Sequence, residues 1–146
     1  MPIPTFNAAG DLPAGIYQAS LPEVIERFGT GSPKRGSVTA SLIRIHSMAR
    51  ATKKLDRLVI FGSYVTKKLA PNDVDIVLVM HDDFDMQSCD EATKALFDHR
   101  QAARVFGASI FWIRPAMLMS ESLKDFIAHW QLKRDGRRRG IVQIKT

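Results

Sequence analysis

Two apolar runs separated by a polar loop constrain this chain more than any other feature. The first run, residues 58–61 (LVIF), ends in Gly62 and Ser63, and the second, residues 74–80 (VDIVLVM), is rich in β-branched side chains. Short apolar runs bounded by turn residues are typical of buried strands. We therefore expect two neighbouring strands inside a core, joined by a loop.

The remaining sequence predicts helices around these strands. Ser20 and Glu23 have the spacing of a capping box, and Gly29 is suited to end the helix that begins after Ser20. We further expect helices over residues 36–54, 88–104 and 121–131, and strands over 108–113 and 141–144. Residues 1–19 are rich in Pro and Gly and predict an extended N-terminal segment. This alternation predicts a single α/β domain over residues 1–146, a small mixed β-sheet with packed helices.

Composition narrows the classes of protein that are possible. The chain is 45% hydrophobic and 25% charged, which is ordinary for a globular domain and argues against disorder. Cys89 is the single cysteine, so neither an intramolecular disulfide nor a cysteine-rich zinc cluster can form. The N-terminus does not have the pattern of a signal peptide, and no apolar run approaches the roughly 20 residues that span a bilayer. We expect a cytoplasmic protein without a membrane partner.

Positive charge is concentrated near the C-terminus. The formal net charge is +6, which favours anionic partners such as NTPs, RNA or DNA. The densest basic run comprises Lys133, Arg134, Arg137, Arg138 and Arg139. This run is either a solvated turn or a binding surface for nucleic acid or an acidic protein. Because no aromatic residue is interleaved, it offers no platform for base stacking.

The turn after the first strand has the composition of a phosphate-binding turn. Gly62 allows the backbone to bend sharply and to approach a ligand without a Cβ clash. Ser63 supplies a hydroxyl and a backbone N–H. A helical turn beginning at Tyr64 would leave N–H groups facing an anion. Lys67 and Lys68 lie just beyond and could offset phosphate charge.

Asp73 and Asp75 form the second half of this candidate site. Residues two apart on a strand point to one face, with Cβ atoms about 6–7 Å apart. Two carboxylates so placed can converge on Mg²⁺ or Mn²⁺, and Mg²⁺ prefers a few carboxylates plus substrate phosphates. Without a cation, they would repel each other beside the core. The alternative is that Asp73 lies in solvent while Asp75 pairs with a Lys or Arg.

This arrangement resembles the minimal nucleotidyltransferases of the DNA polymerase beta superfamily. Their pattern is an apolar residue, Gly, Gly or Ser, a short gap, and then Asp, apolar, Asp or Glu, apolar. Here it reads Phe61-Gly62-Ser63, nine residues, then Asp73-Val74-Asp75-Ile76. The wider chain also resembles a small bacterial and phage family of unknown function near these enzymes, through residues 12–29, 62–78 and 130–144.

The resemblance implies a role for each residue of the motif. Gly62 and Ser63 would bind the phosphates of an NTP substrate, and Asp73 and Asp75 would bind Mg²⁺ as catalytic ligands. The reaction would transfer a nucleoside monophosphate to a hydroxyl of RNA, a protein or a small molecule and release pyrophosphate. The resemblance also associates such small bacterial proteins with toxin–antitoxin or phage-defence pairs.

One position departs from the family pattern. Family enzymes usually carry a third carboxylate on the next strand, where this chain has Ser109. A neutral hydroxyl is a poor Mg²⁺ ligand and a poor base near pH 7. This departure leaves two alternatives open: a degenerate module that binds nucleotide or a partner protein without turnover, and a basic nucleic-acid-binding domain in which the Asp pair is structural.

The histidines and tryptophans do not add a second motif. A lone histidine on a helix, such as His46 or His99, is typical of a partly buried structural residue rather than a general base. Trp112 and Trp130 fall within apolar patterns. We therefore expect both rings to pack in the core rather than to stack on bases.

Overall fold

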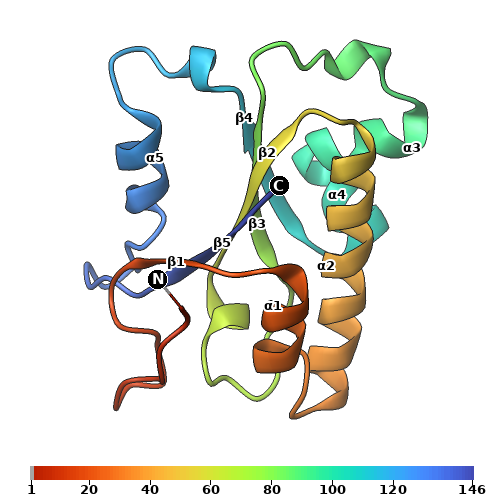
Figure 1. Ribbon diagram of the computed structural model, residues 1–146. Helices are drawn as coiled ribbons and strands as arrows, with labels where there is room; N and C mark the ends of the chain where they lie inside the picture. Colours follow the sequence, from red (N-terminus) through yellow and green to blue (C-terminus); the bar gives the residue numbers. More distant parts are fainter. Residues whose placement is uncertain (1) are drawn as a thin grey trace.

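The computed structural model describes residues 2–146 and contains a five-stranded mixed sheet with helices on both faces (Figure 1). The strands are β1 (Ile16–Gln18), β2 (Leu55–Phe61), β3 (Asp75–Met80), β4 (Ser109–Ile113) and β5 (Ile141–Lys145). The helices are α1 (Leu21–Phe28), α2 (Pro33–Ala51), α3 (Glu91–Lys94), α4 (His99–Phe106) and α5 (Leu123–His129). The predicted α/β class and the mixed sheet are confirmed.

The strand order β1-β5-β2-β3-β4 places the first and last strands at one side of the sheet. β2 is central and runs antiparallel to both of its neighbours, β3 and β5. β3 and β4 are parallel, as are β1 and β5. As a consequence, the end of β2 and the beginnings of β3 and β4 lie at the same edge of the sheet.

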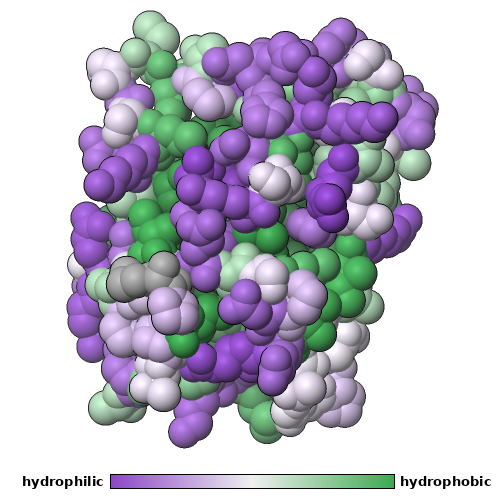
Figure 2. All heavy atoms as spheres, in the orientation of Figure 1, coloured by the Kyte–Doolittle hydropathy of each residue, from purple (hydrophilic) through white to green (hydrophobic). Residues whose placement is uncertain are grey.

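Both faces of the sheet are covered, which explains why its strands are continuously apolar. On one face, Leu58, Ile60, Ile76 and Leu78 belong to the larger core, with α1, α2 and α4. On the other face, the alternate positions of β2 and β3 pack with α5 in a second, smaller cluster. In the orientation of Figure 1, hydrophobic side chains also reach the surface over α5 and beside the middle of α2 (Figure 2).

Capping residues determine where the first two helices begin. The predicted capping box is confirmed, because Ser20 accepts the N–H of Glu23 while Glu23 accepts that of Ser20. α2 begins at Pro33, three residues before the expected start, because Ser32 caps it and Pro33 fits the first turn. It ends at Ala51 rather than residue 54, and Lys53 has a left-handed φ of 62° before β2 begins.

The prediction of a single helix over residues 88–104 is wrong. The chain instead forms a 3₁₀ turn at Met86–Ser88, then α3, a second 3₁₀ turn and α4. Asp98 interrupts the helix because it is extended, with φ −124° and ψ 113°, and its carboxylate accepts the N–H groups of Arg100 and Gln101. An Asp side chain favours capping over a helix interior in this way.

Smaller differences concern the ends of elements. The extended segment 1–19 contains a short strand, β1, which pairs with β5 and was not predicted because three residues carry no clear periodicity. β2 begins three residues earlier than expected, and α5 is four residues shorter than the predicted 121–131. Within residues 2–146, no helix is both long and apolar enough to cross a membrane.

Candidate functional site

The turn after β2 meets the first residue of β3. Gly62 has φ +78° and ψ −164° and leads into a 3₁₀ turn at Ser63–Val65. Phe61 and Asp75 are register partners across the antiparallel pair. A Cβ on Gly62 would overlap Oδ2 of Asp75 and lie 2.9 Å from its Cγ. Glycine is therefore required twice, for the positive φ and for the close approach of the carboxylate.

The two predicted carboxylates are half-buried at the same edge of the sheet. Ser109, the register partner of Asp75 on β4, donates its hydroxyl to Oδ2 of Asp73 at 2.9 Å. Within residues 2–146, neither aspartate takes part in an ion pair. The alternative reading, in which Asp75 is neutralised by a Lys or Arg partner, is therefore not the observed arrangement.

Burial and the neighbouring carboxylate change the acidity of Asp75. Desolvation, followed by repulsion from Asp73, raises the pKa of Asp75 to about 6, against smaller opposing contributions from Arg139 and the Ser109 hydroxyl. Burial and a like charge raise the pKa of a carboxyl group when no positive charge compensates its ionised form. A cation between the two acids would supply that compensation.

A cavity of about 590 Å³ joins this edge of the sheet to the C-terminal basic run. One wall consists of Phe61, Gly62, Ser63, Lys68 and Asp75, which lie between the end of β2 and the start of β3. The other consists of residues that follow α5: Trp130, Leu132, Lys133, Arg134, Asp135 and Arg139. Two features that the sequence predicted separately, the phosphate-binding turn and the basic run, are thus two sides of one space, which we call the Asp75 cavity.

The basic wall is an ordered hairpin rather than a loose turn. Leu132 and Arg138 form an antiparallel bridge, and the N–H of Lys133 donates to the carbonyl of Arg137 at 2.7 Å. Buried Asp11 anchors the hairpin, since its carboxylate contacts Nζ of Lys133 at 2.9 Å and the guanidinium of Arg139 at 3.7 Å. Two cations are thereby held at the cavity by one acid that lies outside its lining.

Three predicted basic residues lie away from the Asp75 cavity. Lys67 lines a different cavity, beside residues 7–11, and its N–H donates to the carbonyl of Gly10 at 2.8 Å. Arg137 is exposed and pairs with Asp135 at 2.8 Å. Arg138 is exposed on the hairpin. Of the predicted basic residues, Lys68, Lys133, Arg134 and Arg139 line the Asp75 cavity.

At this place the chain offers two carboxylates, those of Asp73 and Asp75. Within residues 2–146, there is no group of three or more His, Cys, Asp or Glu side chains that could hold a metal. Ser109 occupies the strand position next to Asp75, as the sequence predicted. The donor set nevertheless suits Mg²⁺, which completes its shell with water and substrate phosphate.

Arg35 on α2 organises the loop, a role that the sequence pattern did not predict. Its guanidinium is buried and donates to the carbonyls of Phe28, Tyr64, Thr66 and Lys68, at 2.6–3.1 Å. Every partner is a neutral backbone carbonyl, so no acid neutralises the positive charge of the Arg35 guanidinium behind the loop that follows β2. The sequence feature that indicates its burial is its spacing, because Arg35 lies three residues before Val38 and therefore on the apolar face of α2.

Replacement of Arg35 should therefore destabilise the fold strongly. We expect Arg35→Met to lower the free energy of unfolding by about 3 kcal/mol or more, because several buried carbonyls lose their donor. Arg44→Met, at an exposed position of α2 where the guanidinium covers Phe106, should cost less than about 1 kcal/mol. Urea unfolding of both variants measures the difference, and equal midpoints would refute this role for Arg35.

Fold and site together define an α/β protein in which a glycine–serine turn and Asp75 share a cavity with a basic hairpin, and Asp73 lies two residues before Asp75. The chain belongs to a family of unknown function, DUF6932, whose model matches residues 4–145. Searches of curated proteins and of solved structures gave no match. Family membership thus covers nearly the whole chain but does not specify an activity, so the function has to be argued from the site.

Proposed function

We propose that this protein binds a nucleoside triphosphate with Mg²⁺ or Mn²⁺ in the Asp75 cavity and transfers the nucleoside monophosphate to an acceptor hydroxyl. The observation that carries the proposal is the meeting of the Gly62–Ser63 turn, Asp75 and a basic hairpin around one cavity, with Asp73 beside Asp75 and, within residues 2–146, neither acid in an ion pair. The nucleotidyltransferase resemblance of the motif supports the same assignment, with pyrophosphate as the second product.

Asp73 and Asp75 are the proposed metal ligands. The absence of a Cβ on Gly62 leaves room for the Asp75 carboxylate, and the Ser109 hydroxyl donates a hydrogen bond to that of Asp73. Bound there, the divalent ion would act as a Lewis acid on the phosphate and lower the charge that builds up in the transition state. The pair also has an electrostatic reason to take up a cation, since burial and the charge of Asp73 disfavour the ionised form of Asp75.

The phosphate ligands come from both walls of the cavity. Ser63 offers a hydroxyl and a backbone N–H, and Lys68 a positive charge. Lys133 and Arg139 face them from the hairpin, already positioned by Asp11. Charge-assisted hydrogen bonds of this kind are the strongest contacts that side chains make with phosphate, and prior anchoring reduces the entropy lost on binding.

The hairpin provides a direct test of nucleotide binding. We expect Arg139→Gln to weaken the affinity for an NTP with Mg²⁺ at least about 10-fold, because a cation in the cavity is lost. Arg138→Gln changes the same charge on the same hairpin, but outside the cavity lining, and should alter the affinity less than about 2-fold. Calorimetric titration with each NTP measures both, and equal losses would show that the basic run acts only through general electrostatics.

Transfer is tested with α-labelled NTPs, Mg²⁺ or Mn²⁺, and either total RNA or protein lysate as acceptor. Label that becomes covalently attached to one acceptor class identifies both the reaction and the substrate. The observation at Ser109 favours a second candidate, a nucleotide-binding module without turnover, since a third carboxylate is missing from that position. NTP-dependent thermal stabilisation with no transfer of label to any acceptor would favour the module over the enzyme.

A further inference from the structure

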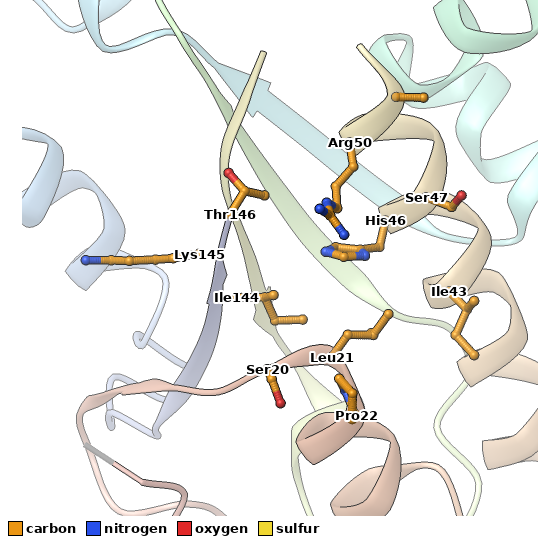
Figure 3. Close-up of a pocket in the computed structure, with 11 residues that line it drawn as sticks. Ser20, Leu21, Pro22, Ile43, His46, Ser47, Arg50, Ile144, Lys145 and Thr146 are labelled. Carbon is orange, nitrogen blue, oxygen red and sulfur yellow. The ribbon is translucent and has the colours of Figure 1, made fainter. Parts of the chain in front are cut away.

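A second and larger cavity, of about 720 Å³, lies on the side of the sheet covered by α1 and α2 (Figure 3). It is open to solvent and is lined by the start of α1, the C-terminal half of α2 and the end of β5. It shares no lining residue with the Asp75 cavity. Its size is within the range of small-molecule sites.

His46 is the buried polar residue in this cavity and is exceptional in its bonding. Seven polar or charged residues are buried within residues 2–146, and six of them have hydrogen-bond partners in the protein: Asp11, Arg35, Thr39, Thr66, Gln131 and Gln143. His46, 7% exposed, has no such partner among the described residues. Its ring projects into the cavity, so its nitrogens are available to whatever occupies that space (Figure 3).

Arg50 lies one helical turn after His46 and is also uncompensated. Its side chain forms no ion pair or hydrogen bond within residues 2–146, and the guanidinium lies beside the imidazole (Figure 3). Burial, and then the charge of Arg50, lower the pKa of His46, which keeps the imidazole neutral at pH 7. No aspartate or glutamate lines the cavity, and Lys145 points away from it (Figure 3).

The rest of the lining combines apolar side chains with the hydroxyl groups of Ser20, Ser47 and Thr146. Leu21 and Pro22 contribute from α1, Ile43 from α2, and Ile144 from β5. Ile43 is 41% exposed, one of the few large apolar side chains left open to solvent. The cavity therefore has one end with hydrogen-bonding groups and a positive charge, and walls that favour an apolar body.

We propose that this cavity binds a small organic anion. A carboxylate or phosphate monoester head would contact the guanidinium of Arg50 and the imidazole of His46, and its apolar part would pack on Leu21, Ile43 and Ile144. A guanidinium binds both kinds of head through paired N–H donors, and the imidazole adds a further hydrogen bond in a partly desolvated setting. This site is independent of the proposed nucleotide site.

The four histidines allow a direct test by NMR, with phenyl phosphate and benzoate as probes at pH 7.5. We expect saturable shifts of the His46 ring resonances, while those of His81, His99 and His129 stay in place. Benzyl alcohol, a neutral analogue, should bind at least about 10-fold more weakly. Equal binding of the neutral analogue, or equal shifts at all four histidines, would overturn the proposal.

Variants locate the binding in the cavity. Arg50→Gln changes an exposed residue and leaves the core intact. It should weaken the binding of phenyl phosphate at least about 10-fold. Arg44→Gln removes the same charge from α2 outside the cavity and should retain binding. Asp75→Asn should retain it as well, because the nucleotide site lies elsewhere. Loss in Arg44→Gln equal to that in Arg50→Gln would mean that general positive charge, not this cavity, attracts the anion.

Discussion

Asp75→Asn is expected to abolish nucleotidyl transfer and, at the same time, to make the fold more stable above pH 6. The pKa of Asp75 is raised from 3.8 to about 6 by burial and by Asp73. The folded state therefore binds the proton more tightly than the unfolded state. The resulting stability is present below pH 3.8 and is lost as the pH rises through 6. An amide has no charge to desolvate and escapes this loss, which amounts to up to about 3 kcal/mol.

Urea unfolding at pH 5 and pH 8 tests the stability half of this expectation. The advantage of Asp75→Asn over the wild type should grow between these two values. Glu26→Gln, an exposed acid-to-amide change on α1, should show no such growth. A less stable Asp75→Asn protein at pH 8 would mean that the ionised carboxylate is already compensated within the protein.

The activity half is measured with labelled NTP. Transfer should fall at least about 1000-fold in Asp75→Asn and in Asp73→Asn, because each change removes an anionic ligand from the proposed metal. Stabilisation of the wild type by Mg²⁺ at pH 8 should disappear in both variants. If transfer persists in either variant, the reaction does not depend on this pair of acids.

Gly62→Ala is expected to be among the most damaging single-methyl changes in the chain. The new Cβ would collide with the Asp75 carboxylate, and the backbone has φ +78°, which L side chains rarely adopt. We expect a loss of about 2–4 kcal/mol in the free energy of unfolding, together with loss of NTP binding. Gly36→Ala, in α2 with no atom within 4 Å of the added Cβ, should instead stabilise by about 0.5–1 kcal/mol.

A double-mutant cycle separates the collision from the backbone strain. In an Asp75→Ala background, the carboxylate is gone, so Gly62→Ala should cost less than in the wild type by about 1 kcal/mol or more. The destabilisation that remains in the Asp75→Ala background measures the cost of placing an alanine at the positive φ of Gly62. An unchanged cost in the two backgrounds would show that the contact between Gly62 and Asp75 contributes nothing to the requirement for glycine.

Local sequence signals predicted the elements wherever side-chain periodicity and capping agreed. The strands around Ile60 and Ile76 were found because burial on both faces makes every position apolar. Ser20 and Glu23 marked the start of α1, since a capping box depends on neighbours in the chain. The break at Asp98 was not predicted because the flanking residues continue a helical pattern. The free energies of Asp98 as an N-cap and as a helix-interior residue differ little, so the local sequence does not distinguish the two.

By itself, the sequence determined the chemistry available at one edge of the sheet. A glycine after one strand and two acids on one face of the next are consequences of backbone sterics and strand geometry, which act over a few residues. The tertiary structure alone decided what surrounds them. The basic hairpin faces Asp75 because Asp11 binds Lys133, 122 residues away, and the loop is held by Arg35 from α2. Such contacts depend on how helices and strands pack, and no local pattern encodes that packing.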